Sequence, residues 1–346
     1  MGENTKPKSH KRIVICGGGN LGHVVAGFVA AQKKHEVYLL TRHPERWSHK
    51  LTIETPDGSS RTGLLSGVYS DPQQVISNAD IVLLCLPGFA IHEILLQIKD
   101  FLRSDTAVGS VVCNTGFFFE ALDLLPSSQP LFGFQRVPFI SRIIKYGHRA
   151  RLMGYKDSLN MAVEHIEHPK ELCNTLSDML QTPIQLLGSH YEVSLSNSNP
   201  LLHPARLYSL WKDWHEGVVY DHIPLFYEEW TEDAAQFYID MDKELQTLLS
   251  HLPVRHENIP DVLNYYESQD ATSLTRKIRS IEAFKGIPAP MRTVEGGFVP
   301  DFQSRYFTED FPYGLAPIQK LAIEKGVNTP MIDKVMSWGQ SILKGE

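Results

Sequence analysis

The sequence predicts an α/β protein with two domains: an N-terminal domain on a doubly wound, mainly parallel sheet, and a C-terminal, mainly α-helical domain. Three observations lead to this prediction. The first half of the chain alternates β-branched runs with helical patterns, a glycine-rich turn follows the first run, and long helical periods dominate beyond about residue 190. At 346 residues the chain has about twice the usual domain length. The change in period alone places the boundary, so we expect domains over residues 1–190 and 191–346.

Strands and helices alternate along the first domain. Runs of β-branched and apolar residues predict strands at 12–16, 36–41, 80–86 and 107–113. Helical patterns occupy 20–33 and 88–102. Between the second and third strands, LTIET and RTGLL flank Pro56-Asp57-Gly58-Ser59, which predicts a small hairpin inserted in the sheet. Weaker patterns predict further strands at 150–154, 159–166 and 183–188, and a helix near 168–180.

Helices are expected to fill the second domain. Helical patterns begin at residues 203 and 231, and Thr329 is placed to cap a last helix that has Pro330 in its first turn. Side chains near Tyr208, Trp211 and Tyr227 are expected to shape a pocket there.

Charge and cysteine content argue against several classes of partner. The net charge is −7 and the only basic tract is the short run at residues 6–12, so we expect no nucleic acid or membrane partner. The four cysteines have no CxxC spacing, and the sequence contains no transmembrane run or signal peptide. We therefore expect a cytoplasmic protein. Without an HExxH or clustered Cys/His ligand set, we expect no metal site.

A glycine motif after the first predicted strand indicates a dinucleotide site. Gly17-Gly18-Gly19-Asn20-Leu21-Gly22 has the GxGxxG pattern and opens a helix. Such a turn lets the backbone approach a pyrophosphate, and the helix N-terminus offers free N–H groups to it. The motif predicts a Rossmann-type domain with Gly17, Gly19, Asn20, Leu21 and Gly22 at the cofactor; the alternative is a purely structural turn.

The second strand ends in Thr41-Arg42-His43, where an NAD site usually has an acidic residue that binds the ribose 2′-hydroxyl. Thr41 and Arg42 instead suit a 2′-phosphate, so we expect NADP as the preferred cofactor, with NAD possible. The alternative is a solvated arginine.

Leu86 and Pro87 end the third strand, and Asn114 follows the fourth, so all three are expected to border the cofactor or its nicotinamide ring unless they are ordinary turn residues.

Two segments of the second domain carry chemically useful side chains. In NPLLHPARLYSLW, His203 directly precedes a proline suited to the first turn of a helix, whose positive end would favour an imidazole that exchanges protons near neutrality. Further on, GGFVPDFQSRYFTEDFPYG has little helical period, and we expect a loop that carries Arg305 and Asp310. Such a loop can hold a substrate carboxylate and orient an imidazole; the alternative is a solvated surface loop.

Five segments, in this order along the chain, resemble the octopine/nopaline (opine) dehydrogenase family. They are GGGNLG, LLTRHPERW, NADIVLLCLPGFAIHE, NPLLHPARLYSLW and VEGGFVPDFQSRYFTEDFPYG. The resemblance runs from about residue 12 to the last helix, and its most specific part is the HP helix together with RYxTEDxPxG. It implies an enzyme that condenses the amine of an amino acid with a 2-oxo acid and reduces the resulting imine with NAD(P)H. The expected partners are therefore small molecules, and the expected state is a monomer or a homodimer.

The resemblance also implies roles for individual residues. His203 would be the general acid/base, Asp310 its orienting carboxylate, and Arg305 the group that grips the oxo-acid carboxylate. Asn199 and Asn114 would contact substrate. In GFQRVPFISR, Arg136 stands where the family has a small polar residue, and it either recognises a further carboxylate or fills space.

Two other functions fit parts of the pattern. A 2-oxo acid reductase resembling ketopantoate reductase shares the first domain, but its catalytic lysine has no evident counterpart here. A dinucleotide-sensing module without chemistry would not need His203, Arg305 and Asp310 together.

Overall fold

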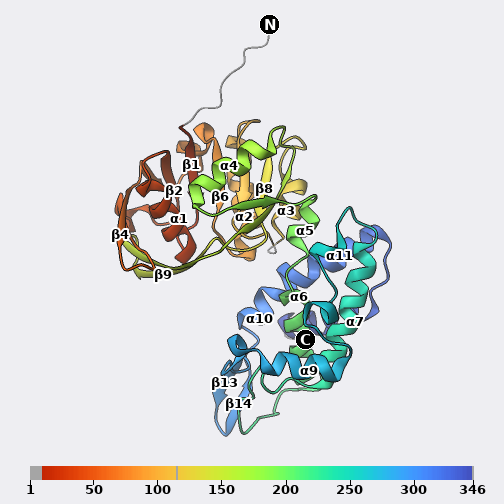
Figure 1. The fold of residues 1–346 in the computed structure, drawn as a ribbon. Helices are drawn as coiled ribbons and strands as arrows, with labels where there is room; N and C mark the ends of the chain where they lie inside the picture. The colour runs from red at the N-terminus through yellow and green to blue at the C-terminus, as the bar shows by residue number, and fades with distance from the viewer. Residues whose placement is uncertain (1–9, 114–115, 345–346) are drawn as a thin grey trace. The chain divides into compact units, whose positions relative to one another are not determined.

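The computed structural model describes residues 10–113 and 116–344, and the chain divides into two compact units, Met1–Ser194 and Leu195–Glu346 (Figure 1). Each unit is described by itself. The first is α/β and the second is mainly helical, so the predicted fold class is confirmed.

An eight-stranded sheet in the order β12-β11-β8-β7-β6-β1-β2-β5 forms the centre of the first unit. All neighbouring strands are parallel except β8 and β11, which are antiparallel. The strands are β1 (Arg12–Cys16), β2 (Glu36–Leu40), β5 (Gly67–Tyr69), β6 (Ile81–Leu84), β7 (Ala107–Ser110), β8 (Leu131–Phe134), β11 (Leu159–Glu164) and β12 (Ile184–Leu186). The helices are α1 (Asn20–Ala31), α2 (Ile91–Ile98), α3 (Phe117–Leu124), α4 (Pro169–Leu180) and α5 (His190–Ser194).

Alternate side chains of β1 belong to two separate apolar cores. Ile13 and Ile15 pack into a core with α1 and α4, whereas Val14 and Cys16 pack into another with α2 and α3. Because successive strand residues point to opposite faces, the sheet is covered on both sides. This explains why its central strands read as continuous apolar runs.

A separate four-stranded sheet has the order β4-β3-β10-β9, formed by β3 (Lys50–Glu54), β4 (Ser60–Leu64), β9 (Phe139–Lys145) and β10 (Arg149–Tyr155). The predicted hairpin is present as β3 and β4, but the prediction that it is inserted in the main sheet is wrong. Instead it packs against α1, where a Cβ at Gly63 would lie 2.3 Å from the carbonyl oxygen of Gly27. Glycine at position 63 permits this approach, which no periodicity in the sequence signals.

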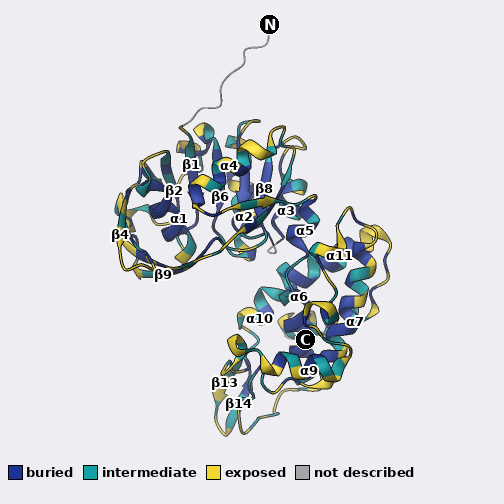
Figure 2. Cartoon of the chain, viewed as in Figure 1, coloured by how far each residue is buried: buried dark blue, intermediate teal, exposed yellow. Residues whose placement is uncertain are grey.

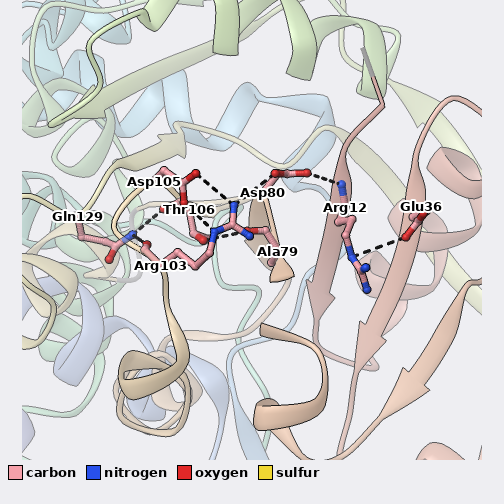
Figure 3. A network of polar contacts seen from close by, with 8 residues as sticks. All are labelled: Arg12, Glu36, Ala79, Asp80, Arg103, Asp105, Thr106 and Gln129. Atoms are coloured by element: carbon pink, nitrogen blue, oxygen red, sulfur yellow. Dashed lines mark hydrogen bonds and ion pairs between the residues drawn. The ribbon is translucent and has the colours of Figure 1, made fainter. Parts of the chain in front are cut away.

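Polar side chains tie the amino ends of the main strands together (Figure 3). The Asp80 carboxylate accepts a hydrogen bond from the Arg12 backbone N–H at 2.8 Å, and Arg103 forms an ion pair with Asp80 at 3.4 Å. Gln129 donates to the carbonyl oxygen of Thr106 at 2.6 Å. This network closes the edge opposite the glycine turn, so the turn lies at the carboxyl edge, where ligands of such sheets bind.

The second unit is built around the buried helix α6, in which every residue from Pro200 to Tyr208 is buried (Figure 2). Helices α7 and α12 pack against it. Its helices are α6 (Asn199–Trp211), α7 (Glu232–Leu249), α8 (Val262–Tyr265), α9 (Ala271–Ser280), α10 (Arg305–Thr308), α11 (Ala316–Lys325) and α12 (Pro330–Lys344). A hairpin of β13 (Met291–Val294) and β14 (Gly297–Pro300) completes it. Across residues 10–113 and 116–344, no helix has the length and apolar character that a membrane span needs.

Candidate functional site

The glycine turn connects the end of β1 to α1 and has the shape of a phosphate cradle. Gly17 has φ +120°, and a Cβ there would lie 2.6 Å from the carbonyl oxygen of Cys85. At Gly22 a Cβ would lie 2.0 Å from the carbonyl oxygen of Gly17. At Gly19, by contrast, a Cβ would meet nothing within 4 Å, and no side chain caps α1 at that residue. Gly17 and Gly22 therefore pack the turn, while Gly19 and the first N–H groups of α1 leave room for a pyrophosphate.

Two side chains of α1 hold this turn in place. The Asn20 side-chain oxygen accepts a hydrogen bond from the Ile143 backbone N–H at 2.8 Å. His23 Nδ1 bonds the carbonyl oxygen of Gly19 at 2.9 Å, and its Nε2 accepts from the Gly147 N–H at 2.7 Å. Because a carbonyl only accepts, the proton is on Nδ1 and the imidazole is neutral; burial also lowers the pKa of His23. No local pattern in the sequence indicates these anchors, because their partners Ile143 and Gly147 lie 123 and 124 positions away in the chain.

The end of β2 carries exposed cations beside the turn. Arg42 is exposed, and the guanidinium of Arg46 lies 4.4 Å from the ring centre of Tyr146. A Cβ at Gly18 would lie 2.8 Å from the Tyr146 hydroxyl oxygen and 3.0 Å from Thr41 Oγ1. Thr41, Tyr146 and the glycine turn therefore form one wall, and a phosphate beyond β2 would meet positive charge.

The other predicted residues of the first unit follow parallel strands at the same edge. Leu86 and Pro87 come after β6 and are partly exposed, and Arg136 comes after β8 and is exposed. Asn114 lies outside the described residues. Because β1, β6, β7 and β8 run parallel, their carboxyl ends share this edge of the sheet.

In the second unit the structure brings His203 and Asp310 together. His203 Nδ1 lies 2.7 Å from Asp310 Oδ2, although the residues are 107 positions apart. The imidazole comes from α6 and is buried, with 9% of its side chain exposed, against 18% for Asp310. A carboxylate at this distance fixes the proton on Nδ1 and stabilises an imidazolium.

The predicted start of this helix is wrong. Helix α6 begins at Asn199 with Pro200 in its first turn, and Pro204 lies inside the helix. His203 is thus one turn into α6 rather than at its positive end. Asp310, not the helix terminus, is the main electrostatic neighbour of the imidazole.

The segment that carries Arg305 and Asp310 is not the predicted loop. Arg305 opens the short helix α10, Asp310 comes directly before one π-helical turn over Phe311–Leu315, and α11 follows. Arg305 is exposed. Asn199 is half-buried and lies one turn before His203 on α6. Because these helices are short or irregular, the segment shows little helical period in its sequence.

Two tyrosines that the sequence analysis gave no chemical role complete the surroundings of the imidazole. The Tyr227 hydroxyl lies 2.8 Å from His203 Nε2. The Tyr306 ring stands edge-on to the imidazole with ring centres 4.6 Å apart. Tyr306 follows Arg305 within the RYxTED motif, so this motif could have marked Tyr306 as a site residue. Tyr227 stands in an aromatic segment of the sequence, and nothing else there indicates its contact with His203.

Groups suited to other chemistries are unreactive or missing among the described residues. All four cysteines are buried and free, and burial raises the pKa of the Cys16 thiol to about 12. Within residues 10–113 and 116–344, no three His, Cys, Asp or Glu side chains gather as metal ligands.

Comparison with known proteins gives the same arrangement of domains. The family described as "NAD/NADP octopine/nopaline dehydrogenase, alpha-helical domain" matches residues 186–343, and that of "Ketopantoate reductase PanE/ApbA" matches residues 13–113. Tauropine dehydrogenase of Arabella iricolor is 30% identical over 366 residues, covering 96% of this chain and 92% of the relative. The chain belongs to the octopine/nopaline dehydrogenase family.

Solved structures of octopine dehydrogenase are similar over nearly the whole chain. One determined with NADH and L-arginine has a TM-score of 0.84 at 27% identity, and covers 96% of this chain and 89% of that one. Another, determined with NADH and pyruvate, has a TM-score of 0.82 at 26% identity, with 95% and 88% covered. This opine dehydrogenase is thus an NAD(P)-dependent oxidoreductase of CH–NH bonds, which condenses an amino acid with a 2-oxo acid and reduces the imine.

Proposed function

We propose that this opine dehydrogenase prefers NADP, joins an amino acid to a small 2-oxo acid, and uses His203 and Asp310 as its proton-transfer pair. Residues 1–190 hold the dinucleotide and residues 191–346 supply the acid/base groups. The observation that carries the proposal is the 2.7 Å hydrogen bond between the buried His203 imidazole and Asp310.

The cofactor site rests on the turn at Gly17, Gly19 and Gly22 and on the open start of α1, where Asn20 and Leu21 offer backbone N–H groups. When bound, the nicotinamide supplies the hydride that reduces the imine. Leu86 and Pro87 border it at the end of β6.

NADP preference is supported by charge at the end of β2. Arg42 is exposed beside Thr41, and Arg46 adds a second guanidinium four residues on. An NAD site would usually have a carboxylate directly after this strand, which would repel a 2′-phosphate.

His203 moves the proton that the condensation requires. Attack of the neutral amine on the 2-oxo carbon moves one proton from the amine nitrogen to the oxygen and gives a carbinolamine. Loss of water then requires a second proton on that hydroxyl, which comes from solvent, and leaves the iminium. Because Nδ1–H is held by Asp310, His203 accepts the amine proton at Nε2 and returns it to the oxygen, and Asp310 stabilises the imidazolium in between.

Arg305 is proposed to hold the 2-oxo acid. Arg305 is exposed, and it is the first residue of α10, directly after the N-cap residue Ser304 and five positions before Asp310. A bidentate guanidinium–carboxylate pair fixes the carbon that receives the hydride. Asn199 and Asn114 are proposed substrate contacts, and Arg136 is proposed to recognise a further carboxylate. Pyruvate is the first 2-oxo acid to test, since a structure of octopine dehydrogenase has been determined with pyruvate.

The test is oxidation of NADPH, and separately NADH, against a grid of 2-oxo acids with and without amino acids. The proposal predicts turnover only when both substrates are present, faster with NADPH, and loss of turnover in His203→Ala. The ketopantoate reductase family matches only residues 13–113, and turnover with a 2-oxo acid alone would favour that type of reductase instead. Cofactor binding without turnover on any pair would favour a dinucleotide sensor.

A further inference from the structure

The second glycine of the cofactor turn lies against a tyrosine from the four-stranded sheet. Gly18 occupies a position that the GxGxxG pattern leaves open to any residue. A Cβ at Gly18 would lie 2.8 Å from the Tyr146 hydroxyl oxygen and 3.0 Å from Thr41 Oγ1, so a larger residue would push both aside. Tyr146 stands in the turn between β9 and β10, far along the chain from the glycine motif. The two hydroxyls therefore flank the place where the glycine turn meets the end of β2.

Both hydroxyls are available to a ligand. Within residues 10–113 and 116–344, neither the Tyr146 hydroxyl nor Thr41 Oγ1 has a hydrogen-bond partner. Both residues are partly exposed. A hydroxyl group at such a position can donate to a phosphate or ribose oxygen of the dinucleotide.

A cation is stacked on the same tyrosine. The Arg46 guanidinium lies 4.4 Å from the ring centre of Tyr146, and Arg46 is exposed. No carboxylate of the described residues forms an ion pair with Arg46, and that of the adjacent Glu45 lies 3.3 Å from His43 instead. The ring thus restricts a flexible arginine while its charge stays available. A hydroxyl and a guanidinium together are donors suited to a phosphate.

The β9–β10 turn is fixed by contacts on both sides of one glycine. The Gly147 N–H donates to His23 Nε2 at 2.7 Å, and the Gly147 carbonyl oxygen accepts from the Ser48 N–H at 2.9 Å. Gly147 has φ +70°, and a Cβ there would lie 2.1 Å from the Arg46 carbonyl oxygen. Because His23 also bonds the Gly19 carbonyl oxygen, one imidazole joins the β9–β10 turn to the glycine turn.

We propose that Tyr146 and Arg46, together with Arg42, bind the 2′-phosphate of NADP, so that the four-stranded sheet supplies a second wall of the adenosine site. The Tyr146 hydroxyl donates to a phosphate oxygen, and the Tyr146 ring positions Arg46 for an ion pair. The place follows from the fold, because the adenosine ribose of a dinucleotide lies beyond the second strand, here β2. These roles rest on the proposed preference for NADP and name residues that decide it.

The experiment measures dissociation constants of NADPH and NADH by fluorescence titration for Tyr146→Phe, Tyr146→Leu and Arg46→Ala. Phe removes only the hydroxyl, whereas Leu also removes the ring on which Arg46 stacks. We expect NADPH to bind about tenfold more weakly to Tyr146→Phe and to Arg46→Ala, and more weakly still to Tyr146→Leu, with NADH within about twofold in all three. Titration with 2′,5′-ADP and 5′-AMP, which differ only in the 2′-phosphate, should show the same contrast.

Two variants of the same sheet are matched controls. Tyr155→Phe removes a hydroxyl from an exposed tyrosine of β10. Arg61→Ala removes a β4 guanidinium that lies 5.1 Å from the ring centre of Phe28, about two turns into α1. Neither should change the affinity for either cofactor by more than about twofold, because both side chains lie away from the glycine turn. Melting temperatures without cofactor identify any variant that is unfolded.

The outcomes separate these roles from the preference itself. If wild type binds NADPH more tightly than NADH, and Tyr146→Phe and Arg46→Ala keep that ratio within twofold, only the roles of Tyr146 and Arg46 are refuted. Equal losses for NADPH and NADH would also refute them, since a 2′-phosphate contact cannot weaken NADH. Equal affinity of wild type for both cofactors would instead refute the proposed preference. If Tyr146→Leu does not fold, Tyr146→Phe and Arg46→Ala still decide the question.

Discussion

Replacing Asp310 by Asn removes one charge from the proton-transfer pair with little change in shape. The carboxylate oxygen lies 2.7 Å from His203 Nδ1, and an Asn oxygen can still accept that hydrogen bond. What the variant loses is the attraction between the carboxylate and the imidazolium that forms when His203 accepts a proton.

The size of the loss follows from the geometry. At about 4 Å between the centres of charge and an effective dielectric constant of about 20, the attraction is about 4 kcal/mol. The 18% exposure of the Asp310 side chain lets solvent weaken it, so a loss of about 3 to 4 kcal/mol is reasonable. At 1.36 kcal/mol per tenfold in rate, kcat should fall by about 10²- to 10³-fold.

The assay is steady-state oxidation of NADPH at saturating amino acid and 2-oxo acid, with the cofactor dissociation constant measured separately. We expect that constant to stay within about twofold, because the glycine turn is untouched. Asp301→Asn is the matched control: its carboxylate accepts from the Gln303 backbone N–H in the same unit and has no hydrogen bond to His203. A kcat within threefold of wild type for Asp310→Asn would refute the stabilisation of an imidazolium by this carboxylate.

Three further variants test the cofactor site and the second unit. Arg42→Ala should raise the dissociation constant of NADPH at least tenfold more than that of NADH, measured by fluorescence titration, because it removes charge opposite a 2′-phosphate; equal losses would refute NADP preference. Gly19→Ala should leave the melting temperature unchanged, since its Cβ meets nothing within 4 Å, yet weaken either cofactor; undiminished binding would contradict a pyrophosphate at that position. Asp242→Asn should stabilise the protein at pH 7 by up to about 3 kcal/mol in denaturant unfolding, because burial raises the pKa of Asp242 from 3.8 to about 6.

The sign of the Asp242 effect follows from proton linkage. Between pH about 4 and 6 the folded protein keeps the Asp242 proton while the unfolded chain loses it, so the contribution of Asp242 to stability falls as pH rises and is constant above about pH 6. Asn at this position removes that slope and still accepts from the Val262 N–H. A stability difference between wild type and Asp242→Asn that does not change from pH 4 to pH 7 would contradict this account.

Sequence reasoning worked where local pattern decides structure. The β-branched runs predicted β1, β2, β6 and β7, and the glycine motif predicted a turn whose packing requires Gly17 and Gly22. Short strands that are completed by distant partners, such as β5, β8 and β9, carried too little pattern of their own. The hairpin at β3 and β4 was found, but its sheet was not, because its pairing with β10 crosses about a hundred residues.

Part of the site was also predictable, because local sequence motifs mark it. His203, Asp310 and Arg305 stand in motifs with unusual residue types, so they could be selected without coordinates. The start of α6 was mistaken because two prolines, Pro200 and Pro204, compete for the first turn. The contact of Tyr227 with His203 depends on a loop fixed by Arg206, and no spacing in the sequence reports such a tertiary hydrogen bond.

The central claim is that His203 transfers the proton that lets an amine and a 2-oxo acid condense before reduction. Mass spectrometry of the product formed from an amino acid and pyruvate, by wild type and by His203→Ala, tests it most directly. We predict a secondary amine dicarboxylate in wild type, one molecule for each NADPH oxidised, and a loss of at least 10²-fold in its rate of formation in His203→Ala. Formation of the 2-hydroxy acid in place of the amine, or an undiminished rate in His203→Ala, would contradict the account.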